Sequence, residues 1–417
     1  MTIKLGSHDP GIAEPGLSAL IERMRHLSGD SAETLRDDKG PAPFAVAAPA
    51  GGWAVADVQR FLTGAGFLPG GQADGICGYR TRAAIRLFQE HVRSVEGRPC
   101  MPDGTAGPKT RAEMVRWRDS GQRASWVSGM AGRADGAPGE RGGDGTDEWR
   151  HWLGFLDTFK ARHLDLADPV FSAVERFDGP SDTRRVADWR FGADELHLIG
   201  IRYGEAIRQG RGFDDVLVLL VKGLVFTFQG STDPGATSHP DGAPFMVRGQ
   251  HDFRLGLHRG RYHALRPSNH ATHGVLVVRS KDGLALDVVD PPTGLAVNGT
   301  INIHWGGIGL RRNVSRWSEG CQVVNGAGYR NHAGDIVDCT DHVAINNGEV
   351  ADPDKRKTRG AYNVLSDLIV AMSSGMADPG TVRYTLLHGS DLAIDPVLAE
   401  RMSELRADAW RRITETG

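Results

Sequence analysis

One histidine and one cysteine are spaced in a way that suits nucleophilic catalysis. His304 lies in the alternating run INIHW, which predicts a strand, and Cys321 follows the turn-forming stretch WSEG and opens a second apolar run, CQVV. If the two strands are neighbours, the imidazole and the thiol come together. A neighbouring imidazole generates the thiolate, which is the reactive form of cysteine. The pattern therefore predicts a cysteine nucleophile with a histidine base.

The turn before the cysteine contains residues that fit the same chemistry. Gly320 permits a sharp change of chain direction, and the backbone N–H groups of Gly320 and Cys321 are candidates to stabilise an oxyanion. Ser318, three residues before the cysteine, is expected to hydrogen-bond within the turn and hold it. These residues predict a site built mainly from one short loop.

The other cysteines have simpler interpretations. Four cysteines in 417 residues are too few for a disulfide scaffold. Cys77 and Cys100 fall in a helical unit where no chemistry is implied, and Cys339 in IVDCTDHV is typical of a half-buried structural residue. The sequence leaves a Cys77–Cys100 or a Cys321–Cys339 disulfide open.

Five histidines gather in one stretch, HDFRLGLHRGRYHALRPSNHATHG: His251, His258, His263, His270 and His273. A zinc site requires compact ligand spacing, as in H-E-x-x-H, and no such spacing occurs here. We therefore expect no metal and no organic cofactor. His258 is a candidate to line the cleft, although a solvated or core position is the more common one for a histidine.

Composition and charge limit the function further. The chain has 49 Lys and Arg against 52 Asp and Glu, a net charge of −3, so no electrostatic case for binding nucleic acid follows. The most apolar run, DVLVLLVKGLVFTF, is too short for a membrane span and contains Lys222; it predicts two buried strands that turn at Lys222–Gly223. The first residues, MTIKLGSHDPGIAEPG, contain no apolar secretory core, so we expect synthesis in the cytoplasm. The oligomeric state is not predicted.

The length predicts several domains. Leu17 to Leu27 have helical spacing, and the stretches 37–52 and 128–145, rich in Gly and in Pro or Ala, predict linkers. The chain divides as follows: 1–52 a helix and linker, 53–120 a compact helical unit, 121–147 a Gly-rich linker, 148–194 a helical connector, 195–390 a β-rich domain and 391–417 a C-terminal helix.

The unit at 53–120 contains an internal repeat. ADGICGYRTRA and PDGTAGPKTRA share the pattern D-G-x-x-G-x-x-T-R-A, in which Asp-Gly predicts a tight turn and the Thr is expected to cap the next helix. The doubled motif resembles a small three-helix peptidoglycan-binding domain, which implies non-catalytic binding to the bacterial cell wall. On that resemblance the wall-binding residues are Asp74, Gly75, Thr81, Asp103, Gly104 and Thr110.

The region around the histidine and the cysteine resembles the L,D-transpeptidase (YkuD-like) family. I-H-W-G followed by S-E-G-C-Q-V is similar to the family pattern of H-G, a gap, S-H-G-C and then Arg or Asn. This chain departs from the pattern at Trp305, at Glu319 in place of a histidine, and at Val323 in place of Arg or Asn. It is closer to a divergent branch with W-S-x-G-C-Q-V that occurs in phage-related wall enzymes.

The two resemblances imply a multidomain α+β protein, with the peptidoglycan-binding domain before a β-rich catalytic domain. Cys321 would attack a stem-peptide carbonyl to form a thioester, with His304 as the base and Ser318 as a supporting residue. Transfer to an amine and hydrolysis both remain open. The residues implied in substrate binding are Trp305, Gln322, Asn325 and His258. Action at the cell wall or in the periplasm leaves three routes open: a phage lysis system, a specialised secretion route and a virion-borne enzyme.

Two other classes of function stay open. One is a zinc-dependent cell-wall amidase or peptidase that uses the histidine stretch. The other is a non-catalytic wall-binding, phage-related protein that keeps the fold without turnover.

Overall fold

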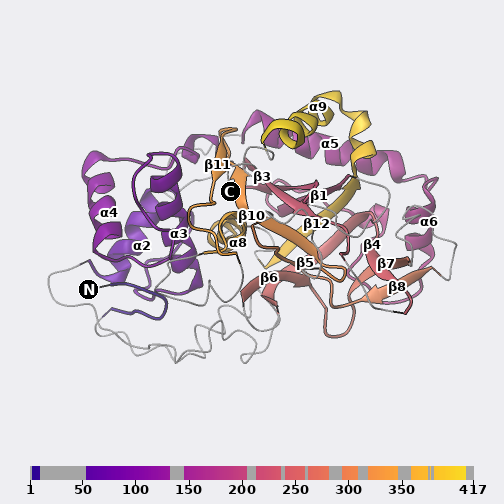
Figure 1. Cartoon of the computed structure of the whole chain (residues 1–417), viewed down its shortest axis with the longest axis horizontal. Coiled ribbons are helices and arrows are strands. Elements are labelled where there is room, and N and C mark those ends of the chain that lie inside the picture. Colours follow the sequence, from indigo (N-terminus) through magenta and orange to yellow (C-terminus); the bar gives the residue numbers. More distant parts are fainter. Residues whose placement is uncertain are drawn as a thin grey trace.

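A helical module packs against a larger β-rich body (Figure 1). The computed structural model describes residues 2–9, 53–131, 145–203, 213–235, 240–258, 262–280, 294–308, 318–345, 358–373, 376 and 380–409. We call residues 2–9 and 53–131 the helical module and the described residues from 145 onward the β-rich body. The mixture of helices and strands agrees with the predicted α+β class. The predicted helix at 17–27 and the predicted linker at 37–52 lie outside the described residues.

Three helices build the module: α2 (Val55–Gly64), α3 (Tyr79–Ser94) and α4 (Pro108–Ser120). α3 and α4 start alike, because the second glycine of each repeat, Gly78 or Gly107, is the N-cap residue. Thr81 and Thr110 lie at the third position inside their helices and cap neither one. The predicted capping by threonine is therefore wrong, since the extended N-cap position already belongs to the glycine.

An aromatic cluster holds the module together. The ring of Phe67 lies 5.5 Å from Phe88, 5.7 Å from Trp117 and 5.0 Å from Trp126, measured between ring centroids. Trp126, close to the short 3-10 turn η1 (Val127–Gly129), is buried and donates its indole N–H to the Gly66 carbonyl at 2.9 Å. Residues 121–131 are thus packed against the module instead of forming the free linker predicted there; residues 132–144 lie outside the described part.

Residues 2–9 also belong to the module, although they were assigned to a separate segment from the sequence. Ile3 pairs with Ala106 and His8 with Ile76 in isolated β-bridges, so this short segment lies across both repeat loops. The carboxylate of Asp9 accepts hydrogen bonds from Val55 N at 2.6 Å and from the next backbone N–H at 3.0 Å. Asp9 therefore satisfies the exposed amides at the start of α2 from a distant point in the chain.

Nine of the described strands form one sheet in the order β11-β10-β3-β2-β1-β12-β5-β6-β9. β9 also pairs with β10, so the sheet curls back on itself and the region is barrel-like. The strands are β1 (Leu196–Arg202), β2 (Asp215–Val221), β3 (Leu224–Ser231), β5 (Gly249–His258), β6 (Tyr262–Pro267), β9 (Ile303–Trp305), β10 (Gln322–Arg330), β11 (Ile336–Asp338) and β12 (Thr381–His388). A separate three-stranded sheet contains β4 (Ala243–Met246), β7 (Val275–Ser280) and β8 (Leu295–Asn298).

The hairpin predicted in the most apolar run is confirmed. β2 and β3 pair antiparallel, with Val221 opposite Leu224. The two residues between them, Lys222 and Gly223, have φ values of 45° and 84°. Two positive φ angles in a two-residue loop match the twist of antiparallel strands.

Helices cover the body on two sides (Figure 1). α5 (Asp147–His163) and α9 (Pro396–Glu404) lie together on one side, where His151 Nε2 is 2.6 Å from the Asp395 carboxylate. Asp395 also accepts from Leu398 N at 3.1 Å and so caps α9. The remaining helical segments are α6 (Pro169–Arg176), α8 (Ala361–Met372), η2 (Val186–Asp188), η5 (Gly389–Ile394) and η6 (Leu405–Ala409).

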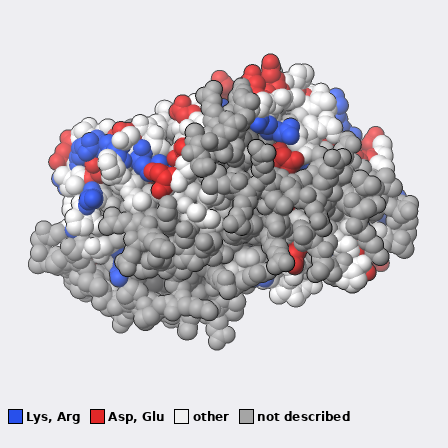
Figure 2. Space-filling view, viewed as in Figure 1, with Lys and Arg blue, Asp and Glu red and all other residues white. Residues whose placement is uncertain are grey.

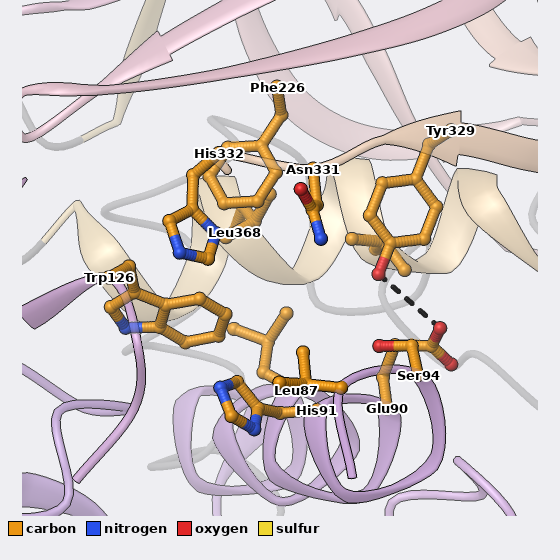
Figure 3. A pocket seen from close by; sticks show the side chains of 12 residues that line it. Leu87, Glu90, His91, Ser94, Trp126, Phe226, Tyr329, Asn331, His332 and Leu368 are labelled. Carbon is orange, nitrogen blue, oxygen red and sulfur yellow. Dashed lines mark hydrogen bonds between the residues drawn. The ribbon is translucent and has the colours of Figure 1, made fainter. Parts of the chain in front are cut away.

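The almost wholly buried helix α8 lies between the module and the sheet, so the two parts share one apolar core. Arg86 on α3 contacts the buried Asp367 on α8 at 2.5 Å. Figure 3 shows a second contact, where the Tyr329 hydroxyl donates to the Glu90 carboxylate at 3.3 Å. The small cavity drawn there holds about one water molecule, which indicates a close fit.

No helix in the described ranges is long and apolar enough to cross a membrane. On the face shown in Figure 2, basic and acidic side chains are interspersed over the described atoms.

Candidate functional site

The first repeat loop is built around a buried glutamine from α2. Gln59 donates through Nε2 to the Asp74 carboxylate at 2.8 Å and to the Thr81 hydroxyl at 3.0 Å. The same nitrogen lies 2.9 Å from the Ile76 carbonyl, and Gln59 Oε1 accepts from Gly75 N at 2.9 Å. One side chain thus contacts Asp74, Gly75, Ile76 and Thr81.

The second repeat loop uses Gln89, from α3, in the same way. Gln89 Nε2 donates to the Asp103 carboxylate at 2.9 Å and to the Thr110 hydroxyl at 3.0 Å, while Oε1 accepts from Gly104 N at 2.8 Å. Gly104 has a φ of 77°, which favours glycine at this turn. The internal repeat is therefore a repeated hydrogen-bond network.

These contacts change the interpretation of the six residues predicted to bind the wall. Asp74, Gly75 and Thr81 bond to one glutamine, and their counterparts in the second copy bond to the other. The motif therefore holds the loops in shape, and residues 2–9 lie across it. The sequence interpretation missed both glutamines. Each lies in the helix that precedes its Asp-Gly pair, at a matching distance along the chain, and this position is their only signal in the sequence.

The second candidate region lies where β9 and β10 meet. The two strands are neighbours, as predicted, and they run parallel with His304 opposite Val323. Side chains two residues apart point to the same side of a strand, so Cys321 and His304 face the same side of the sheet. Cys321 immediately precedes β10 and lies beside Asn302.

The thiol of Cys321 is half-buried and has two backbone neighbours. Asn302 N donates to the sulfur at 3.4 Å, and the sulfur lies 3.7 Å from the Thr300 carbonyl. A backbone N–H directed at sulfur favours the thiolate, whereas the carbonyl accepts the proton of the neutral thiol. The surroundings therefore accommodate both protonation states.

The turn before Cys321 is held by the serine, as expected from the sequence. Ser318 Oγ donates to the Cys321 carbonyl at 2.5 Å and accepts from Gly320 N at 3.1 Å. Gly320 has a φ of 140°, and a Cβ here would lie 2.6 Å from Pro244 Cγ, so only glycine fits. Because the Gly320 N–H is used inside the turn, the oxyanion role predicted for it does not agree with this arrangement.

His304 is buried and its ring is fixed in one orientation. Its Nδ1 lies 2.8 Å from the Trp305 carbonyl and 3.1 Å from the Tyr262 hydroxyl. Because a carbonyl only accepts, Nδ1 bears the proton in the neutral ring and Nε2 is the basic nitrogen. This tautomer suits a group that accepts a proton through Nε2.

A second imidazole lies against the first. The rings of His258 and His304 are 4.1 Å apart, with 25° between their planes, and Asn302 Nδ2 donates to His258 Nδ1 at 3.2 Å. His258, a candidate for lining the cleft, thus stacks on His304, and its role in substrate binding stays a prediction. Tyr262, which pairs with His258 across the β5–β6 hairpin, was missed, although residues that flank a short hairpin loop are expected to face each other.

Three residues predicted to bind substrate are buried. Trp305, Gln322 and Asn325 are 0% exposed. Gln322 donates to the Thr232 carbonyl at 3.1 Å and accepts from the Tyr384 hydroxyl at 3.0 Å, and Asn325 donates to Gln229. Their placement gives them structural roles, because β10 is covered on both faces of the curled sheet.

All four cysteines are free thiols, and their surroundings differ sharply. Burial raises the pKa of Cys77 and of Cys100 to about 12 and holds the pKa of Cys339 well above its usual range. Cys321 alone among the four is not fully buried. It is therefore the thiol that a reagent or a substrate reaches most easily.

Of the five clustered histidines, His251 is fully buried and bonded to Thr183 at 2.9 Å. Within the described ranges, no group of three or more His, Cys, Asp or Glu is placed to hold a metal ion.

Comparison with known proteins identifies one part of the chain. Residues 52–114 match the family described as "Putative peptidoglycan binding domain". No curated protein and no solved structure matches the chain. The matched range covers α2, α3 and most of α4, so the helical module contains a peptidoglycan-binding domain and associates the protein with the cell wall.

Proposed function

We propose that this protein is a cysteine-dependent enzyme that modifies the stem peptides of peptidoglycan. The observation that carries the proposal is the half-buried thiol of Cys321 on the same side of the sheet as His304, in a chain whose other three thiols are buried. The peptidoglycan-binding domain supplies the substrate class, because it would hold the enzyme at the wall.

The proposed reaction begins with transfer of the thiol proton to His304 Nε2. The sulfur then attacks a stem-peptide carbonyl, a C–S bond forms, and the C–N bond breaks as the leaving amine takes the proton back from His304. An amine acceptor or water next attacks the thioester and releases the cysteine. An amine gives transpeptidation or exchange, and water gives carboxypeptidase or endopeptidase activity.

A covalent adduct tests this proposal. After incubation of the full chain with soluble muropeptides, intact-mass spectrometry should show an added acyl group, and peptide mapping should place it on Cys321. Cys321→Ser should prevent a thioester, while Cys339→Ser serves as a control for a buried thiol. An adduct on another cysteine would overturn the assignment.

A non-catalytic wall-binding role is the second candidate, and the family match favours it because only the binding module is matched. It predicts that the full chain sediments with purified sacculi while no muropeptide changes in mass. It also predicts that Cys321→Ser binds as tightly as the wild type.

A further inference from the structure

Two faces of the helical module are already occupied. α3 packs against α8 of the body, with Arg86 and Asp367 in contact, and residues 2–9 lie across the two repeat loops. In Figure 1, α2 and α4 lie on the side of α3 that is away from α8 and the body. A wall polymer must therefore approach the module from this side or along its edges.

A groove of about 460 Å³ lies on that side, lined by Trp53, Asp57, Arg60, Phe61 and Arg118. Phe61 is anchored in the core by an edge contact with Phe88 at 5.2 Å, and its ring lies 5.7 Å from Trp53. The groove thus presents an aromatic surface that the core holds in place.

Charged groups border the aromatic surface. The Arg118 guanidinium lies 5.3 Å from the Trp53 ring, and Arg60 pairs with Asp57 at 2.5 Å. Asp57 also accepts from Ala54 N at 2.9 Å, which fixes the direction of its carboxylate. The side chains of Arg60 and Arg118 are 62% and 54% exposed, so their N–H groups reach solvent.

We propose that this groove is the wall-binding site of the module and that it binds the glycan strand of peptidoglycan. This inference rests on the wall association and adds the polymer and the contact residues. A pyranose ring has an apolar C–H face, which packs on an aromatic ring, and a rim of hydroxyl and acetamido groups. Trp53 takes the C–H face, Asp57 accepts from hydroxyl or amide N–H groups, and the arginines donate to acetamido carbonyls.

The test uses the full chain and two probes: purified sacculi in a sedimentation assay, and peptide-free N-acetylglucosamine oligomers as soluble competitors. Trp53→Ala and Arg118→Ala should each weaken sedimentation by roughly tenfold or more, as for contacts at the centre of an interface. The oligomers should compete with sacculi for the wild type. Trp53→Phe should retain part of the affinity because it keeps an aromatic face.

The matched control is Arg150→Ala, which removes a surface arginine of similar exposure (48%) from α5 of the body. Circular dichroism and thermal unfolding show whether each variant is folded; if Trp53→Ala is not, Arg118→Ala decides the matter. If neither variant weakens binding, the groove is not the binding site. If soluble stem peptides compete and glycan oligomers do not, the glycan strand is not the ligand. A wild type that does not sediment at all would instead contradict the wall association itself.

Discussion

The repeat loops of the module and the turn before Cys321 use similar residues to different ends. In both, a short polar side chain bonds to nearby backbone: Asp74 accepts from Ile76 N at 2.9 Å, and Ser318 accepts from Gly320 N at 3.1 Å. In each loop a buried glutamine then bonds to the aspartate, the glycine and the threonine of the motif. At the turn, the sulfur of Cys321 stays within reach of solvent. The motif D-G-x-x-G-x-x-T-R-A, which occurs twice, serves folding. The Cys321 thiol, which suits chemistry, occurs in a single turn.

The largest effect is expected when the two proposed catalytic groups, Cys321 and His304, are replaced. Cys321→Ser should reduce turnover of muropeptides by ~10³-fold or more, because a hydroxyl is a much weaker nucleophile than a thiolate. His304→Ala should reduce it by ~10²–10⁴-fold. Product release measured by chromatography checks both, with Cys100→Ser as a control. Full activity in Cys321→Ser would remove the proposal that the enzyme depends on this cysteine.

For substitutions in the repeat loops we expect the opposite pattern: the free energy of unfolding falls, and the turnover of muropeptides does not change directly. Gln89→Ala removes hydrogen bonds to Asp103, Thr110 and Gly104 and leaves buried polar groups unsatisfied, so we expect a loss of roughly 3 kcal/mol in the free energy of unfolding. Urea unfolding measures it, and the exposed Gln122→Ala should cost less than about 0.5 kcal/mol. If Gln89→Ala unfolds like the wild type, the network is not what holds the loop.

The dependence of stability on pH tests the contact between the module and the body. Burial lowers the pKa of His91 and of His332 to about 4, and both rings lie 3.1 Å from the Ser125 hydroxyl, where module and body meet. Their contribution to stability is complete above pH ~6.5, the pKa of an unfolded histidine, and is lost as the pH falls towards 4. Asp367, whose pKa burial raises to about 6, changes in the opposite direction and offsets part of the loss.

We therefore expect the His91→Gln, His332→Gln double variant to lose roughly 2 kcal/mol less than the wild type between pH 7 and pH 4. Other buried histidines also have lowered pKa values, so the informative quantity is the difference between the two proteins. Urea unfolding at both pH values measures it. If both proteins lose the same free energy of unfolding between the two pH values, the protonation of these two rings does not change on unfolding.

The smallest expected effect is a difference among the four cysteines in their rate of reaction with iodoacetamide. In the folded, reduced chain, Cys321 should react with iodoacetamide at pH 7 at least about tenfold faster than Cys77, Cys100 or Cys339, since burial and a raised pKa protect those three. Peptide-resolved mass spectrometry follows all four at once, and denaturant should equalise their rates. A slower Cys321 in the native chain would place it among the structural thiols.

Local patterns were enough to predict much of the fold. The β2–β3 hairpin, a helix in the C-terminal region and the pairing of the strands next to His304 and Cys321 are all confirmed, because each depends on periodicity, turn residues or short connections. Gln59 and Gln89 were not predicted, since a glutamine in a helix gives no local sign of the loop that it will satisfy.

The burial of Gln322 and Asn325 could not be predicted either. The residues of β10 do not alternate between apolar and polar, and the curled sheet buries both faces of this strand. Polar residues there become internal hydrogen-bonding partners. Whether a strand is covered on one side or two depends on the closure of the whole sheet, and no short window of sequence contains that information.

The contacts of residues 2–9 have a consequence for the order of events during synthesis. This segment leaves the ribosome before the two repeats, and its partner Ala106 follows roughly 100 residues later, so the pairing closes a very long loop. Before Ala106 emerges, the segment can already reach α2 through Asp9 and the first repeat through His8 and Ile76. The module should therefore acquire its full native protection from proteases late in translation, once the second repeat has emerged.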